Sequence, residues 1–262
     1  MLAWVEKQVL ACRPLAMRYF KQAKLKVRRK ADDSPVTDAD KAIEEKLRKA
    51  FAKSFPGERI VGEEFGASGP EGNSYWTIDP IDGTRGFSRG LPSWGILVSR
   101  VERGIPNLAV VDYPAVNVTL ATAPGVPAYE RTGTRIQRFR RAPKPPKLND
   151  TVIFHGGARW WQGTHFEKGF NELIRTCLLE RAYGDCYGYL WLFRGNADAV
   201  IEYGVKPWDV LPFAALAAAT GRVQADFSGK PHSLGPQTVT AHPGLALHIG
   251  HILRGVEGTI VV

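Results

Sequence analysis

Two aspartates, Asp79 and Asp82, follow an apolar run in the segment Trp76-Thr-Ile-Asp-Pro-Ile-Asp-Gly-Thr84. Hard divalent cations such as Mg²⁺ bind oxygen ligands, usually a few carboxylates completed by water and substrate phosphate. Two carboxylates at this spacing can bridge two such ions. Gly83 and Thr84 come next, and their backbone amides can bind phosphate oxygens if a helix begins there. The pattern therefore indicates a metal site joined to a phosphate site.

The same spacing also suits an ordinary polar turn in which Asp82 caps a helix. Three further segments favour the metal site, because each places an acid at the end of an expected element. They are Val61-Gly-Glu-Glu64 after a short apolar run, Val36-Thr-Asp-Ala-Asp40 at the start of a helical pattern, and Lys206-Pro-Trp-Asp-Val210 before the apolar run 211–220.

With these four segments in this order and spacing, the chain resembles the inositol monophosphatase superfamily of Mg²⁺-dependent, lithium-sensitive phosphatases. The resemblance extends from the first expected helix to about Gly229. It implies an α+β and α/β fold, a layered α-β-α-β-α sandwich of the inositol monophosphatase and fructose bisphosphatase type. It also implies Mg²⁺ as the cofactor, with two to three ions in each site, and a homodimer.

The resemblance assigns metal ligands to five positions of this chain. Glu63, Asp79 and the carbonyl of Ile81 would hold one ion, and Asp79, Asp82 and Asp209 would hold a second. A third, weaker ion would share Glu63.

The resemblance also assigns residues to the attacking water and the phosphate. Thr84 and Glu63 would orient and deprotonate that water. Asp40 would support the metal ligands without binding a metal itself. The backbone at Gly83 and Thr84 would bind phosphate. Lys30 would lie nearby.

Within the superfamily, the chain is similar to bacterial histidinol-phosphatases, above all in Gly184-Asp-Cys-Tyr-Gly-Tyr189. Histidinol phosphate carries an amine and an imidazole, so extra carboxylates near the alcohol portion have an electrostatic reason to be present. Asp185 and Glu202 are the expected substrate contacts. An equal alternative for Asp185 is that it caps the helix that begins near Tyr187.

The expected function is hydrolysis of histidinol phosphate to histidinol and phosphate, a step of histidine biosynthesis. A phosphatase for inositol 1-phosphate or a related small sugar phosphate is the alternative within the enzymes. The alternative that is not an enzyme is a regulatory or RNA-binding protein on the same scaffold. It is disfavoured because RNA binding does not need Glu63, Asp79, Asp82, Thr84 and Asp209 together.

Composition fits a cytoplasmic enzyme. The 262 residues, 44% hydrophobic, can form one large domain or two small ones. No run approaches the ~20 apolar residues that span a membrane, and the charged N-terminus lacks the core of a signal peptide. The three cysteines show no metal-ligand spacing and fit reduced thiols.

The net charge of +9 is concentrated in residues 21–30, with six Lys/Arg, and residues 131–147, with seven. Such stretches can bind nucleic-acid backbones. Phe139 is their only aromatic residue, however, so they do not resemble a stacking platform. We favour a solvated helix end and a basic surface connection, and expect no nucleic-acid or membrane partner.

Hydrophobic periodicity and turn signals predict the elements that must position these residues. Helices are expected at 2–25 (divided or kinked at Pro14), 38–55, 165–177, 187–195 and 208–220. Strands are expected at 59–62, 75–79, 94–102, 107–113, 117–122, 151–155, 197–202 and 222–227. Prolines near 143–146 mark a boundary. We expect an N-terminal half, 1–145, with most metal motifs, and a C-terminal half, 146–262, with Asp209 and the substrate-recognition residues.

Overall fold

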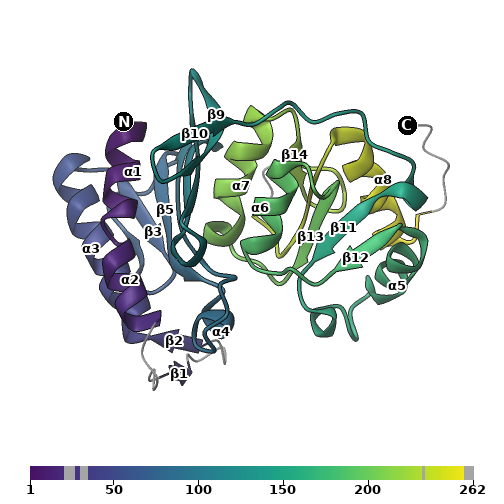
Figure 1. Cartoon of the computed structure of the whole chain (residues 1–262), viewed down its shortest axis with the longest axis horizontal. Coiled ribbons are helices and arrows are strands. Elements are labelled where there is room, and N and C mark those ends of the chain that lie inside the picture. The colour runs from purple at the N-terminus through teal and green to yellow at the C-terminus, as the bar shows by residue number, and fades with distance from the viewer. Residues whose placement is uncertain (21–26, 30–34, 232–233, 257–262) are drawn as a thin grey trace. The chain divides into compact units, whose positions relative to one another are not determined.

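The computed structural model describes residues 1–20, 27–29, 35–231 and 234–256 (Figure 1). The chain divides into two compact units, Met1–Arg138 and Phe139–Val262. None of the described helices combines the length and apolar character that crossing a membrane requires. Lys30 and most of the basic stretch 21–30 lie outside the described residues.

An eight-stranded sheet forms the centre of the first unit, in the order β10-β9-β8-β7-β6-β5-β3-β4. Its neighbouring strands are antiparallel except for the parallel pair β3 and β5. The strands are β3 (Arg59–Gly62), β4 (Gly66–Ser68), β5 (Tyr75–Asp82), β6 (Gly95–Glu102), β7 (Ile105–Tyr113), β8 (Val118–Ala123), β9 (Val126–Thr132) and β10 (Arg135–Arg138). The sheet is therefore mainly antiparallel. A separate pair, β1 (Val27–Arg29) and β2 (Pro35–Thr37), precedes it.

Three helices, α1 (Leu2–Leu10), α2 (Arg13–Phe20) and α3 (Asp38–Ser54), cover one face of this sheet (Figure 1). The division of the first helical run is confirmed. Pro14 lies in the first turn of α2, where its missing amide costs no helical hydrogen bond. The rings of Phe51 on α3 and Trp76 on β5 meet edge to face with centroids 4.7 Å apart. This contact belongs to the apolar core that fixes α3 against the strand carrying the aspartates.

The strand predicted at 75–79 is longer in the structure and includes both aspartates. β5 continues to Asp82, with a shift in its register against β6 between the two aspartates. Pro80 has no amide to donate to a strand neighbour, and the irregular pairing accommodates it. Gly83 then adopts a left-handed conformation (φ 87°), and the short helix α4 (Thr84–Phe87) begins.

A five-stranded mixed sheet forms the centre of the second unit, in the order β12-β11-β13-β15-β14. Its strands are β11 (Val152–His155), β12 (Leu179–Arg181), β13 (Ala199–Tyr203), β14 (Val223–Ala225) and β15 (Gln237–Ala241). Helices α5 (Glu167–Thr176) and α8 (Pro243–Arg254) pack on one face, and α6 (Tyr187–Arg194) and α7 (Pro207–Ala219) cover the other (Figure 1). The layered α+β class is therefore confirmed. In this unit, β12, β15 and α8 were not predicted from the sequence.

The basic stretch 131–147 was predicted to be one surface connection. In the structure it includes the end of β9 and all of β10. Arg131 forms an ion pair with the buried Glu6 at 2.6 Å. All four residues of β10 are exposed at the edge of the sheet. Charged side chains are a common feature of edge strands, because they oppose pairing with another chain.

Candidate metal and phosphate site

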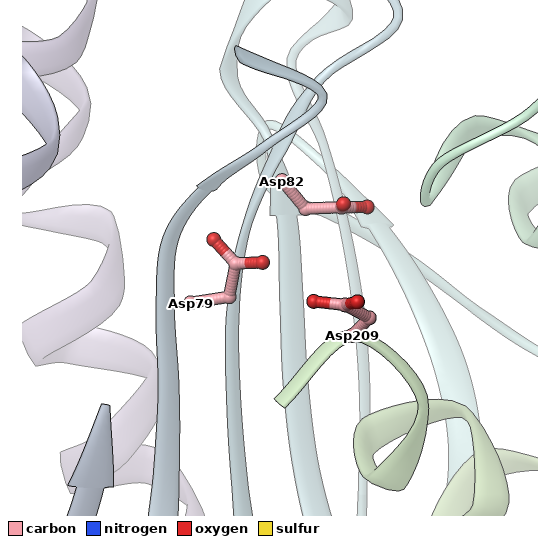
Figure 2. A group of neighbouring side chains, drawn as sticks. All are labelled: Asp79, Asp82 and Asp209. Carbon is pink, nitrogen blue, oxygen red and sulfur yellow. The ribbon is translucent and has the colours of Figure 1, made fainter. Parts of the chain in front are cut away.

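Three aspartate side chains converge in the structure. Asp79 and Asp82 come from the end of β5, and Asp209 comes from the first turn of α7. One carboxylate oxygen from each lies within 4.8 Å of the other two, and Figure 2 shows the three groups directed toward one another. Asp79 is buried, while Asp82 and Asp209 are half-buried. Three carboxylate oxygens so close together fit the ligand preference of Mg²⁺.

Alternation along β5 determines where Asp79 points. Trp76 and Ile78 face the core beneath α3, so Asp79, one residue later, lies on the opposite face. Its Oδ1 accepts a hydrogen bond from the amide of Ile81 at 3.0 Å. This bond closes a local turn inside the irregular part of the strand and holds one carboxylate oxygen in place.

Asp209 is positioned by the start of α7. Pro207 occupies the first turn, where its fixed φ favours a helix. The amide of Lys206 donates to Asp209 Oδ2 at 2.7 Å, so the carboxylate caps the helix whose third position it occupies. The partial positive charge of the helix N-terminus also favours an anionic side chain there.

Three residues to which the resemblance assigns different roles in the site meet in the first unit: Thr84, Asp40 and Ile81. The Thr84 hydroxyl donates to the Ile81 carbonyl at 3.0 Å and lies 3.3 Å from Asp40 Oδ1. Asp40 is fully buried at the start of α3, where its Oδ2 accepts from the amide of Thr37 at 2.8 Å and from the Thr37 hydroxyl. The structure thus connects the first turn of α3 to the end of β5.

Burial raises the pKa of Asp40 from 3.8 to about 6. The two hydrogen bonds from Thr37 oppose this shift, and the negative charge of Glu63 adds to it. The carboxyl group of Asp40 is therefore nearer neutrality at physiological pH than an exposed aspartate.

Glu63 follows β3, and its amide donates to the carbonyl of Ile78 on β5 at 3.1 Å. Its side chain is half-buried and close enough to Asp40 to influence that carboxyl. Glu63 lies outside the group of three aspartates whose oxygens are within 4.8 Å. Its predicted roles as metal ligand and proton acceptor stay predictions.

The predicted phosphate-binding backbone lies at the start of α4. Gly83 precedes this helix with a positive φ that glycine adopts without strain. The first amides of a helix have no acceptor within the helix, so those at Gly83 and Thr84 can face an anion.

The two predicted substrate residues belong to neighbouring parts of the second unit. Glu202 is buried on β13, and a Cβ added to Gly156 would lie 2.5 Å from its Oε2. A Cβ added to Gly184 would lie 3.0 Å from the Cα of Gly156. The turn that carries Asp185 and the carboxylate of Glu202 therefore both pack against Gly156, a residue the sequence analysis did not single out.

Asp185 is exposed and has a positive φ of 56°. Helix α6 begins at Tyr187 as expected, but Cys186 occupies the N-cap position. Asp185 thus lies one residue before the cap, which weakens the capping alternative.

Glu44, to which the sequence assigned no role, is fully buried on α3 and paired with Arg48 at 2.7 Å. Glu44 follows Asp40 by four residues, so the two share a helix face. That spacing could have identified it, but a Glu-Glu pair in an amphipathic helix suggests solvent exposure.

The chain is similar to a known family along most of its length. The model of the "Inositol monophosphatase family" matches residues 2–255. A histidinol-phosphatase from Mycobacterium tuberculosis is 33% identical over 198 residues, covering 75% of this chain and 76% of that protein. A fructose-1,6-bisphosphatase/inositol-1-monophosphatase from Thermotoga maritima is 31% identical over 195 residues, covering 74% and 72%. The solved structure of a Thermotoga maritima IMPase has a TM-score of 0.84 at 25% identity and covers 97% of both chains.

The matched region contains all four acidic segments and nearly all of both units. The solved structure has the same fold along almost its entire length. The chain therefore belongs to the inositol monophosphatase family.

Proposed function

We propose that this phosphatase hydrolyses small phosphate monoesters with Mg²⁺ and that histidinol phosphate is its preferred substrate. The observation that carries the proposal is the group formed by Asp79, Asp82 and Asp209, whose oxygens lie within 4.8 Å of one another. Mg²⁺ held there would neutralise phosphate charge and lower the pKa of a bound water. A phosphate monoester repels hydroxide in bulk water, so charge neutralisation is the first requirement of the reaction.

The other residues orient the reactants. The Thr84 hydroxyl, held between the Ile81 carbonyl and Asp40, fixes the position of the attacking water. Glu63 accepts the proton of that water. The amides of Gly83 and Thr84 meet the charge that spreads over the phosphoryl oxygens in the transition state.

Substrate preference is assigned to Asp185 and Glu202. Both carry carboxylates, and in the second unit Glu202 and Gly184, the residue before Asp185, both approach Gly156 closely. A carboxylate gains a charge-assisted hydrogen bond from an amine or a protonated imidazole and none from an uncharged sugar. The relative named histidinol-phosphatase supports this preference. The proposal also places the protein in the cytoplasm. It further includes a homodimer, which sedimentation of the purified protein would test.

Inositol 1-phosphate or a related sugar phosphate is the second candidate substrate, favoured by the relative named fructose-1,6-bisphosphatase/inositol-1-monophosphatase. Phosphate release should be measured with histidinol phosphate, inositol 1-phosphate, fructose 1,6-bisphosphate and 3′-phosphoadenosine phosphates. We expect the highest kcat/KM with histidinol phosphate, no turnover in excess chelator and inhibition by lithium. Higher kcat/KM with inositol 1-phosphate would select the second candidate, and full turnover in chelator would reject the metal mechanism.

Replacing Asp185 by Asn tests the recognition role. Loss of one hydrogen bond to a charged group should weaken histidinol phosphate by about 1.5–3 kcal/mol and leave inositol 1-phosphate nearly unchanged. Asp150→Asn, an exposed aspartate elsewhere in the second unit, is the control. Equal losses on both substrates would reject direct recognition by Asp185.

A further inference from the structure

We propose that Glu44 and Arg48 of α3 are positioning residues that set the affinity of the metal site by fixing the turn that carries Glu63. The inference rests on the proposed function, because Glu63 is a proposed metal ligand. It concerns two residues with no assigned role in binding or chemistry, and all of its contacts lie within the first unit.

The carboxylate of Glu44 binds the backbone immediately after Glu63. Its Oε2 accepts from the amide of Glu64 at 2.7 Å, and its Oε1 lies 3.2 Å from the amide of Phe65. Glu44 has no solvent-exposed surface. A buried carboxylate must recover the hydration that it loses, and these amides and Arg48 provide that compensation. The turn between β3 and β4 is therefore held from inside the fold.

Arg48 completes the connection on the other side of the turn. Its Nε donates to Glu44 Oε1 at 2.7 Å, and its Nη1 donates to Ser68 Oγ at 2.9 Å. Its Nη2 donates to the carbonyl of Gly66. The planar guanidinium thus joins the carboxylate of Glu44 to β4, a geometry that a lysine cannot reproduce.

Gly62 makes this approach possible. A Cβ at this position would lie 2.0 Å from Glu44 Oε1 and 2.8 Å from Arg48 Nη2. Any side chain at the residue directly before Glu63 would therefore displace the buried pair. Because Gly62 has no side chain, the carboxylate of Glu44 can occupy the space beside it.

Glu44 also places Glu63 relative to the Thr84 hydroxyl. Asp40, one helical turn before Glu44, contacts that hydroxyl, and Glu63 lies near Asp40. Helix α3 therefore positions the Thr84 hydroxyl through Asp40 and the Glu63 turn through Glu44, two side chains four residues apart. Loosening the Glu63 turn should weaken metal binding before it affects chemistry at saturating metal.

The test compares Glu44→Gln with Glu45→Gln, the neighbouring residue on α3. Glu45 makes the same type of pair with Lys49, at 2.6 Å, but both side chains are exposed. Mn²⁺ binding without substrate should be measured by electron paramagnetic resonance, together with the Mg²⁺ dependence of kcat and KM. Loss of partners that hold a ligand typically weakens metal binding about 10–100-fold, and we expect a loss of this size for Glu44→Gln. Glu45→Gln should bind as the wild type does.

At saturating Mg²⁺, kcat of Glu44→Gln should return to within a few-fold of the wild-type value. Unchanged Mn²⁺ affinity with a lower unfolding midpoint would overturn the proposal and leave Glu44 a purely structural residue. If Glu44→Gln does not fold, Arg48→Lys provides the same comparison, and unchanged Mn²⁺ binding in that variant would equally overturn it. Wild-type protein that binds no Mn²⁺ would instead reject the proposed function itself.

Discussion

Asp40 and Asp209 occupy equivalent positions in two helices and have different surroundings. Each is the third residue of its helix and uses Oδ2 to accept the amide of the residue before the helix, Thr37 or Lys206. Asp40 is fully buried, and its Oδ1 lies beside the Thr84 hydroxyl. Asp209 is half-buried and joins Asp79 and Asp82.

The same local motif thus presents a carboxylate to different neighbours in the two helices. In each helix the capping hydrogen bond fixes the orientation of the aspartate carboxylate and occupies one of its two oxygens. The neighbours supplied by the fold then decide the chemistry. A hydroxyl lies beside Asp40 and fits its proposed supporting role, whereas two further carboxylates lie beside Asp209 and fit its proposed role as a metal ligand.

The largest expected effect is that of Asp209→Asn. The amide keeps an oxygen for the helix cap but loses the charge that binds a cation. Metal ions supply several kcal/mol of transition-state stabilisation, which corresponds to about a 1,000-fold loss of kcat/KM. Calorimetric Mg²⁺ titration and phosphate release measure the change, with Asp150→Asn as the control. Retention of wild-type metal binding would remove Asp209 from the site.

The next effect is on stability and concerns Asp40 in metal-free protein. Its folded pKa of about 6 exceeds its ordinary 3.8, so the native state binds more protons than the unfolded state between these values. Stability should therefore be greatest below pH 4 with respect to this group and should fall by about 3 kcal/mol as pH rises through 6. Urea unfolding in chelator should show this decrease in wild type and a flatter profile in Asp40→Asn. Identical profiles would contradict the raised pKa.

A smaller loss is expected in the turnover of Asp40→Asn. The variant keeps the Thr37 amide as a partner but alters the group that holds the Thr84 hydroxyl. Positioning partners of this kind typically contribute about 10–100-fold. Steady-state kinetics at saturating Mg²⁺ should show this loss in kcat with little change in KM. A loss as large as that of Asp209→Asn would erase the proposed difference between the two aspartates.

The smallest effect separates the two helix caps. Thr37 contributes a hydroxyl that lies 3.2 Å from the amide of Ala39, whereas Lys206 contributes only its backbone amide, since a lysine side chain cannot accept a hydrogen bond. Thr37→Ala should lower the free energy of unfolding by about 1 kcal/mol, and Lys206→Ala should leave it nearly unchanged. Equal changes in urea unfolding would show that the caps do not differ in this way.

The sequence alone determined much of the local structure. The helices predicted from apolar spacing and turn signals at 38–55, 187–195 and 208–220 agree with α3, α6 and α7 to within one residue at their starts. These signals act between residues a few positions apart, so they can be read from the chain. The acids at the ends of elements were recognised in the same way.

Other elements depended on long-range pairing. β5 extends through Asp79–Asp82 because β6 supplies a partner across an irregular register, and β10 forms because β9 lies beside it. The proline and the arginines in those segments argued locally against strands. Pairing with a neighbouring strand satisfies backbone groups and can override such preferences.

What the sequence determined about this protein is therefore the set of acids and the local elements that carry them. Only the tertiary structure placed Glu44 in the interior beside the Glu63 turn and Glu45 in solvent, although the two are adjacent in the chain. It alone brought Asp79, Asp82 and Asp209 within 4.8 Å. The physical reason is that burial and the approach of distant groups are properties of packing, and residues far apart in sequence acquire them only when the chain is folded.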